Sequence, residues 1–186
     1  MKKILITGGA GYVGSLLTRK LQEEGNKVII YDTCFYGNNH IKENDNLKLI
    51  KADIRDKNIF SSAVEGIDIV IHLACISNDP SFALNEELSK SINFDCFEDL
   101  VSISKKSGVS RFIYASSSSV YGFSEDDNVT EEHPLVPLTL YNKFKGLCEP
   151  ILTKYTDEDF VGTIIRPATL CGYAPRCRLD LSVNIL

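Results

Sequence analysis

The chain has 186 residues, of which 44% are hydrophobic and 24% charged, as in an ordinary globular domain. Its net charge of −5 argues against nucleic acid or an anionic membrane surface as a partner, because both are polyanions. No apolar stretch is long enough to span a bilayer. The apolar segment after Lys2 and Lys3 is soon interrupted by glycines, which favours a buried strand over a signal peptide. We therefore expect a cytoplasmic protein.

The short apolar runs of the chain alternate with helical stretches. Strands are predicted at Lys3–Thr7, Lys27–Tyr31, Leu47–Lys51, Asp68–Leu73, Arg111–Ala115 and Val161–Ile165. Helices are predicted at Tyr12–Glu24, Lys57–Val64, Leu84–Ser107 and Tyr141–Tyr155. Strands that are apolar throughout are buried on both faces, and their alternation with helices is typical of a doubly wound parallel sheet. The predicted fold class is therefore α/β.

A glycine-rich turn follows the first predicted strand. Gly9, Gly11 and Gly14 satisfy the pattern G-x-G-x-x-G, and Gly8 opens a second register that shares the last two glycines. Such a turn lets the backbone approach a pyrophosphate, which the amides at the start of the next helix then bind. The residues predicted to touch a dinucleotide here are Gly8, Gly11, Tyr12, Val13 and Gly14.

An acidic residue ends the second predicted strand, about twenty residues after the turn. The carboxylate of Asp32 is suited to accept hydrogen bonds from the adenosine ribose hydroxyls, and it would repel a 2′-phosphate. No arginine follows directly to receive such a phosphate. The predicted cofactor is NAD rather than NADP, and the predicted domain is a Rossmann fold.

Two aspartates follow the third predicted strand. Asp53, with its neighbour Ile54, is assigned to the cofactor, where the carboxylate could reach the adenine amino group. The alternative is that Asp53 or Asp56 caps the following helix, and Asp56 is assigned mainly to that role.

Tyr141 and Lys145 lie one turn apart on a predicted helix, and therefore on one face. They follow the serine-rich segment 116–119 at the end of the fifth predicted strand, where open α/β sheets place their chemistry. A surface tyrosine–lysine pair and a serine-rich strand end are the structural alternative.

As a set, these residues resemble the extended short-chain dehydrogenase/reductase family, in particular its nucleotide-sugar epimerases and dehydratases. The resemblance runs along essentially the whole chain. It rests on the segments 7–14, His72-Leu73-Ala74, Asn93, 114–122, Tyr141-x-x-x-Lys145 and Arg166-Pro167. By position, the catalytic serine or threonine of the family falls on Ser117.

The resemblance implies hydride transfer from a sugar hydroxyl to NAD. Tyr141 would be the base, Ser117 would hold the hydroxyl, and Lys145 would bind the nicotinamide ribose. A free tyrosine has a pKa near 10, so we expect the Lys145 ammonium and the nicotinamide charge to lower the pKa of Tyr141.

Further cofactor contacts are implied by the resemblance alone. Leu73, Ala74 and Asn93 would line the cofactor groove, and the backbone at Pro167 would meet the carboxamide. Core packing is the alternative for Leu73 and Ala74, and a buried polar role that satisfies backbone groups is the alternative for Asn93. His72 is expected to be structural.

The chain departs from the family pattern at the expected substrate side. Family dehydratases carry an Asp-Glu pair after the catalytic Ser/Thr, whereas this chain has Ser118 and Ser119. Oxidation or epimerisation at C4 is therefore favoured over dehydration. Thr169 stands where many epimerases have a sugar-binding asparagine. The predicted substrate contacts are Ser117, Ser118 and Thr169.

Two alternative functions stay open. One is an NAD(P)-dependent reductase of a non-sugar carbonyl, against which Asp32 argues. The other is a non-catalytic NAD-binding module, against which the intact tyrosine and lysine argue.

The predicted organisation is an NAD-binding domain over residues 1–166 and the start of a truncated or disordered substrate-binding domain over 167–186. The resemblance also implies a homodimer formed through the helices Leu84–Ser107 and Tyr141–Tyr155. None of the six cysteines and three histidines forms a recognisable metal motif, so no metal is predicted and the cysteines are expected as small buried hydrophobes.

Overall fold

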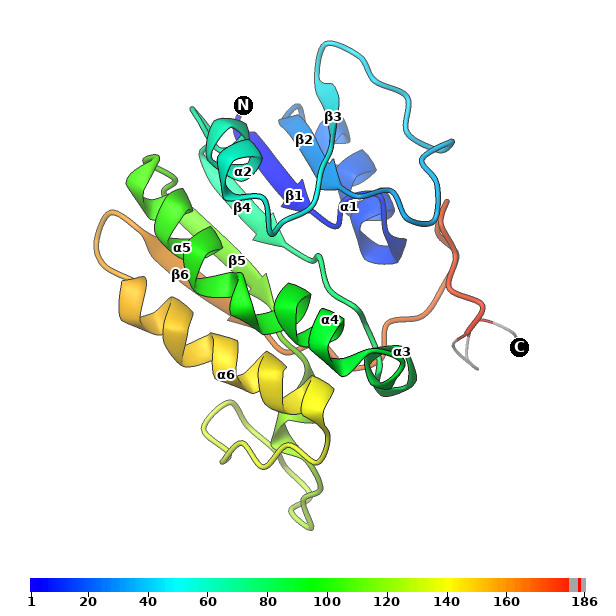
Figure 1. The fold of residues 1–186 in the computed structure, drawn as a ribbon, viewed down its shortest axis with the longest axis vertical. Helices are drawn as coiled ribbons and strands as arrows, with labels where there is room; N and C mark the ends of the chain where they lie inside the picture. Colours follow the sequence, from blue (N-terminus) through cyan, green and yellow to red (C-terminus); the bar gives the residue numbers. More distant parts are fainter. Residues whose placement is uncertain (181–183, 185–186) are drawn as a thin grey trace.

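The protein is a parallel α/β sheet with helices on both faces (Figure 1). The computed structural model describes residues 1–180 and 184. The strands lie in the order β3-β2-β1-β4-β5-β6, and all five neighbouring pairs are parallel. Their bounds are β1 Lys3–Thr7, β2 Lys27–Asp32, β3 Leu47–Lys51, β4 Ile69–His72, β5 Arg111–Ala115 and β6 Val161–Ile165. The predicted doubly wound fold class is confirmed.

Six α-helices and two short irregular turns connect these strands within the described part of the chain. The α-helices are α1 Tyr12–Glu23, α2 Lys57–Ala63, α3 Asp79–Ala83, α4 Glu86–Lys90, α5 Phe97–Lys106 and α6 Leu140–Tyr155. The irregular turns are the π-helical turn η1, Ser91–Asp95, and the 3₁₀ turn η2, Ser118–Tyr121.

The two faces of the sheet are covered by different helices. In Figure 1, α2, α5 and α6 lie in front of the sheet and α1 lies behind it. The front core includes Phe60 of α2, Phe97 of α5 and Leu152 of α6. The rear core joins Leu17 and Leu21 of α1 to β1 and β2. Because each face has its own apolar layer, the strands are buried on both sides, as their uniform apolarity indicates.

The chain changes direction across the sheet between β1 and β4. β1 pairs with β2 on one side and with β4 on the other, with Thr7 beside both Tyr31 and His72. In open α/β sheets, ligands bind outside the carboxyl ends of the strands at such a switch point. The glycine-rich turn after β1 and the loop after β4 therefore meet where a ligand is expected.

The prediction of one helix over Leu84–Ser107 is wrong in two respects. Leu84 ends α3, and α4 begins only at Glu86, because the Asn85 side chain accepts a hydrogen bond from the Leu88 amide and caps it. The helical stretch that follows is then interrupted by the π-helical turn η1 between α4 and α5. Such a turn inserts one residue into the helical repeat, and no residue type in this stretch signals it.

Two further predictions, for the cysteines and for a membrane span, can be compared with the structure. All six cysteines carry free thiols; Cys34, Cys96 and Cys148 are buried as expected, whereas Cys171 is exposed. Over residues 1–180 and 184, no helix combines the length and the apolarity that crossing a bilayer requires.

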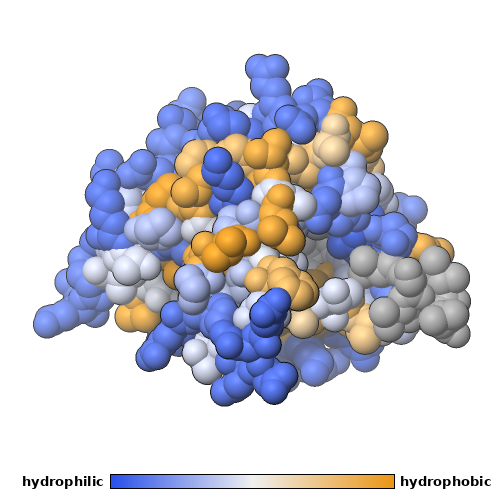
Figure 2. All heavy atoms as spheres, turned by 90° about the horizontal axis from the view of Figure 1, so that it is seen from below, coloured by the Kyte–Doolittle hydropathy of each residue, from blue (hydrophilic) through white to orange (hydrophobic). Residues whose placement is uncertain are grey.

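Exposed apolar side chains gather near the start of α6. Seen from below the view of Figure 1, the surface carries apolar patches between polar side chains (Figure 2). The loop between η2 and α6, at the lower end of Figure 1, exposes Phe123, Val136 and Leu138. This apolar surface therefore adjoins the helix that carries Tyr141.

Candidate functional site

The glycine-rich turn forms a cradle that only residues without a side chain can build. Gly8 has a φ of +73°, and a Cβ there would lie 2.7 Å from the Ala74 amide nitrogen. A Cβ on Gly14 would lie 2.6 Å from the Gly9 Cα. Gly11 caps α1 without a side-chain hydrogen bond, so the first amides of α1 have no side-chain cap and are available to an anion. These features fit the pyrophosphate of a dinucleotide.

Asp32 lies directly against this cradle. One carboxylate oxygen accepts a hydrogen bond from the Ala10 amide at 3.0 Å, and the other accepts one from the Cys34 amide at 2.8 Å. Each oxygen keeps further acceptor capacity. The carboxylate is therefore fixed beside the turn and able to receive ribose hydroxyls.

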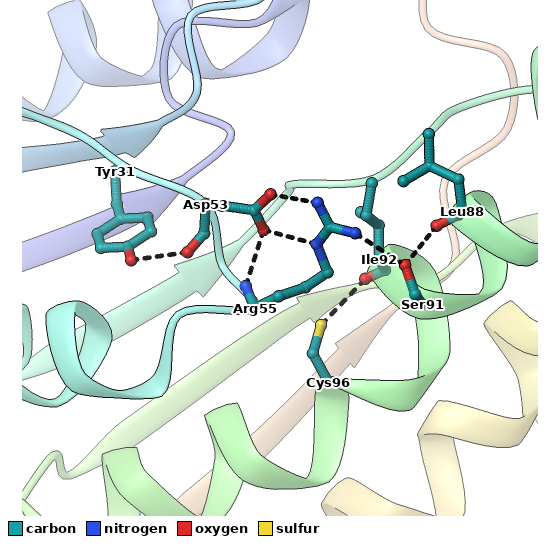
Figure 3. Close-up of polar contacts among 7 residues, drawn as sticks. All are labelled: Tyr31, Asp53, Arg55, Leu88, Ser91, Ile92 and Cys96. Atoms are coloured by element: carbon teal, nitrogen blue, oxygen red, sulfur yellow. Dashed lines mark hydrogen bonds and ion pairs between the residues drawn. The ribbon is translucent and has the colours of Figure 1, made fainter.

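Asp53 is held by Arg55, as Figure 3 shows. The Asp53 carboxylate accepts hydrogen bonds from the Arg55 amide at 2.9 Å, from Nε at 2.9 Å and from Nη2 at 2.6 Å. These bonds hold the pKa of Asp53 below its usual value. The Arg55 guanidinium also donates to the Ser91 hydroxyl at 3.1 Å. The carboxylate predicted to reach adenine is thus already engaged with a cation at the surface.

The residues beside Asp53 have structural roles. Ile54 is buried in the front core, and the Tyr31 hydroxyl donates to the Asp53 carbonyl at 3.0 Å. Burial, reinforced by the charges of Asp56 and Asp53, raises the pKa of Tyr31 to about 12. Asp56 caps α2 by accepting hydrogen bonds from the Asn58 and Ile59 amides, so its predicted capping role is confirmed.

His72 and Asn93 organise the loop after β4. His72 Nδ1 and Thr7 Oγ1 share a hydrogen bond at 2.7 Å. Burial, with the charge of Lys145, lowers the pKa of His72 to about 3, so the ring is neutral and structural. The Asn93 side chain accepts from the Ile76 amide at 2.8 Å and donates to the Ile76 carbonyl at 2.9 Å. Asn93 therefore satisfies backbone groups, which was the alternative to its cofactor contact.

The loop after β4 also carries Leu73 and Ala74, which are partly buried. Leu73 packs against the rear core and Ala74 against the front core. The Ala74 amide donates to Thr7 Oγ1 at 3.3 Å, and the same amide faces Gly8. Both residues thus line the seam between the loops after β1 and β4.

The carboxyl end of β5 binds Lys145 and leads into Ser117. The Lys145 side chain is buried and its Nζ donates to the Ala115 carbonyl at 2.7 Å. Ser117 follows two residues later in an extended conformation, and its Oγ caps η2 by accepting from the Ser119 amide at 3.2 Å. The bond to Ala115 therefore ties α6 to the strand end that presents Ser117.

Tyr141 lies one helical turn before Lys145, next to the loop after β4. Its ring contacts Phe82 of α3 edge to face, with centroids 6.4 Å apart. Burial raises the pKa of Tyr141 above its usual value, the charges of Cys75 and Asp79 raise it further, and Arg178 opposes them. The cation that opposes this rise is Arg178, whereas the predicted effect of Lys145 together with the nicotinamide charge stays a prediction.

The other predicted contacts lie around this edge. Tyr12 begins α1, and its hydroxyl donates to the Gly172 carbonyl at 2.6 Å. The Ser118 amide donates to the Pro167 carbonyl at 2.9 Å. Val13 lies in the first turn of α1 and is partly buried. Thr169 is exposed.

Several side chains at this edge were not expected from the sequence. Glu149, one turn after Lys145, is buried and forms an ion pair with Arg166, with Nη2 and Oε2 2.6 Å apart. Its periodic position after Tyr141 and Lys145 was the available signal. Arg178 pairs with Asp180, which also accepts from Asn78 Nδ2 at 3.0 Å. No local pattern links Arg178 to Tyr141, since 37 positions of sequence separate them.

Comparison with known proteins identifies the family. The family model described as "NAD dependent epimerase/dehydratase family" matches residues 4–182. The chain is 32% identical to a UDP-glucose 4-epimerase of Lactobacillus helveticus over 153 residues, covering 81% of this chain and 46% of that protein. It is 33% identical to a UDP-N-acetyl-alpha-D-glucosaminuronate decarboxylase of Bacillus cytotoxicus over 189 residues, covering 95% and 56%. The chain thus spans about half the length of these relatives.

A solved structure shares the fold. It is a UDP-glucose-4-epimerase of Stenotrophomonas maltophila with bound NAD and formylated UDP-arabinopyranose, 26% identical with a TM-score of 0.82. The similarity covers 89% of this chain and 52% of that one. The family description agrees with the predicted cofactor, and its match over nearly the whole chain agrees with the predicted resemblance. The chain therefore belongs to the NAD-dependent epimerase/dehydratase family.

Proposed function

We propose that this chain is the cofactor-binding part of an enzyme that oxidises the C4 hydroxyl of a nucleotide-activated sugar with NAD. The bond from Lys145 Nζ to the Ala115 carbonyl carries the proposal. It joins the helix of Tyr141 to the strand end of Ser117, on the sheet edge that also holds the glycine cradle. Relatives named as epimerases and as decarboxylases of UDP-sugars support this substrate class.

The residues divide the chemistry as follows. NAD, when bound, supplies the hydride acceptor. Gly8, Gly11 and Gly14 admit the pyrophosphate, and Asp32 receives the ribose hydroxyls. Tyr141 takes the proton of the sugar hydroxyl, and Ser117 holds that hydroxyl in line. Since burial raises the pKa of Tyr141, its phenolate depends on nearby cations, of which Arg178 and Lys145 belong to this chain.

Oxidation at C4 is compatible with two products. Return of the hydride to the opposite face of the sugar would give a 4-epimer. Oxidation of a uronic acid at C4 would instead give a β-keto acid, which loses carbon dioxide readily. Dehydration is disfavoured because Ser118 and Ser119 offer no acid or base. Epimerisation is the outcome we propose first, and the decarboxylase relatives supply the second candidate.

The test is incubation of the protein and its Tyr141→Phe variant with NAD and a panel of UDP-, GDP- and dTDP-sugars. The wild type should form NADH or an altered sugar with at least one member. Tyr141→Phe should keep NAD affinity within about 3-fold and lose turnover by about 10²- to 10⁴-fold. Tyr155→Phe, on the same helix and bonded to Glu98 at the surface, is the matched control. Equal turnover in Tyr141→Phe and wild type would reject the mechanism.

The same proposal includes a cytoplasmic homodimer. Six free thiols suit a reducing compartment, and α5 and α6 lie side by side on one face (Figure 1). This arrangement would let the predicted Leu84–Ser107 and Tyr141–Tyr155 segments form one interface. A monomer in analytical sedimentation would reject the dimer and leave the chemistry untouched.

A further inference from the structure

Both sides of Ser117 are tied to one buried ion pair. Before it, the Ser116 hydroxyl donates to Glu149 Oε1 at 2.5 Å. After it, the Tyr121 hydroxyl at the end of η2 accepts from Arg166 Nη1 at 2.6 Å. Glu149 and Arg166 in turn pair through two hydrogen bonds, Nε to Oε1 at 3.1 Å and Nη2 to Oε2 at 2.6 Å. The segment that presents Ser117 is thus held at both ends by the same two side chains.

The pair also holds the helix of Tyr141. Glu149 lies one turn after Lys145 and two turns after Tyr141, on the same side of α6. Arg166 directly follows β6, and the Ser116 amide donates to Ile165 of that strand at 2.8 Å. Three elements, namely β5, β6 and α6, therefore converge on one contact.

The ion pair of Glu149 and Arg166 makes more directed contacts than the stability of the fold requires. The Glu149 side chain is 5% exposed and the Arg166 side chain 19% exposed. Replacing a buried ion pair by apolar side chains of similar volume is often neutral or stabilising, whereas removing one partner is costly. Arg166 also donates to the Glu131 carbonyl at 3.0 Å and stacks over the Tyr121 ring. Four donor contacts in fixed directions define a geometry that an apolar contact would not.

We propose that Glu149 and Arg166 are positioning residues that set the distance between Ser117 on one side and Tyr141 with Lys145 on the other. The inference rests on the proposed function for its catalytic consequence, but the geometric part concerns this chain alone. Neither side chain touches the reacting atoms. They act through Ser116, through the Ala115 carbonyl that holds Lys145, and through Tyr121.

The discriminating variant is the double substitution Glu149→Met/Arg166→Met. It keeps volume and removes the polar tie. Its melting temperature should stay within about 5 °C of the wild type, because the buried Ser116 hydroxyl loses its acceptor while the apolar pair avoids the desolvation of two charges. The catalytic rate constant with the best sugar of the panel should fall about 10²-fold, the loss expected from a displacement of about 1 Å. KM and NAD affinity should stay within about 3-fold. The double substitution Glu98→Met/Lys154→Met removes an exposed ion pair between α5 and α6 and should change none of these values.

A second measurement does not need turnover. The Lys145 signal in a spectrum of protein with ¹³C-labelled lysine, assigned with Lys145→Arg, should shift in Glu149→Met/Arg166→Met and stay in place in the control. An unchanged Lys145 signal or an unchanged catalytic rate constant in the stable double variant would overturn the inference. A shifted signal in a protein that converts no sugar would support the positioning role and reject the proposed function.

Discussion

One half of the candidate site consists mainly of backbone groups, and the other half depends on side chains. The half at β1 and β2 is made largely of backbone: glycines that leave room, amides at a helix start, and one carboxylate fixed by two amides. The half at β5, β6 and α6 depends on side chains: Lys145 is bound to the Ala115 carbonyl, and Glu149 is paired with Arg166. The backbone half should therefore tolerate no added side-chain atom. The side-chain half should tolerate changes of side-chain volume, but not the loss of its directed hydrogen bonds.

The largest effect is expected for Gly14→Ala, which fills the glycine cradle. Its Cβ would meet backbone atoms of Gly8 and Gly9, which cannot move without opening the turn. Overpacking of this kind costs about 3 kcal/mol or more, so NAD affinity measured by titration should fall more than about 100-fold. Gly146→Ala is the control, because a Cβ there meets only ordinary contacts at 3.8 Å. Equal NAD affinity in both variants would contradict the cradle.

Ser117→Ala tests the second half without disturbing the first. The hydroxyl that would hold the sugar is lost, so turnover should fall about 10²-fold while NAD affinity stays unchanged. Ser119 is exposed and bonds within the turn through its backbone amide and carbonyl, so Ser119→Ala should keep turnover within about 2-fold. If the two variants turn over alike, Ser117 has no catalytic role.

Asp32→Asn sharpens the comparison on the cofactor side. The amide keeps one acceptor and loses the charge, so NAD affinity should fall about 10-fold, the value of one charge-assisted hydrogen bond. NADP affinity should hold or improve, because the charge that repels its 2′-phosphate is gone. Parallel titrations with both cofactors measure the ratio, and an unchanged ratio would exclude Asp32 from the choice.

His72 lies between the two halves. It shares a hydrogen bond with Thr7, and the positive charge of Lys145 helps to lower its pKa. Its folded pKa of about 3 lies below the unfolded value near 6.5. The stability that it contributes is therefore complete above pH 6.5 and is lost as pH falls towards 3. Within that window, this one group contributes about 1.4 kcal/mol per pH unit to the free energy of unfolding. Urea unfolding should show a steeper pH slope for wild type than for His72→Gln, and equal slopes would refute the neutral buried ring.

The same contrast explains what the sequence could predict. Local patterns predict all six strands, the order of the site residues along the chain and the glycine cradle, because each depends on residues adjacent in sequence. Asp56 as a helix cap belongs to this class as well. Asn78, Pro80 and Asn85 were cap and first-turn signals of the same local kind for α3 and α4, and they went unused in the prediction of one long helix.

The rest depends on contacts between distant segments. Asn93 could be placed in a helix, but its bonds to Ile76 arise from the fold. Asp53 was assigned to adenine from its position after β3, whereas its bidentate pairing with Arg55 became visible only in the structure (Figure 3). The burial of Tyr141 and the nearness of Arg178, which act on its pKa in opposite directions, are likewise properties of packing.

The π-helical turn η1 makes this architecture sensitive to chain length as well as to residue type. One extra residue between α4 and α5 rotates everything on one side of the turn by about 100° relative to a continuous α-helix. Deleting a single residue from Ser91–Asp95 would restore ordinary α-helical spacing and turn the Asn93 amide away from Ile76. The loop after β4 is thus held in register by an insertion, and a gap of one residue in a relative at this point would mark a differently shaped site even where every motif residue is retained.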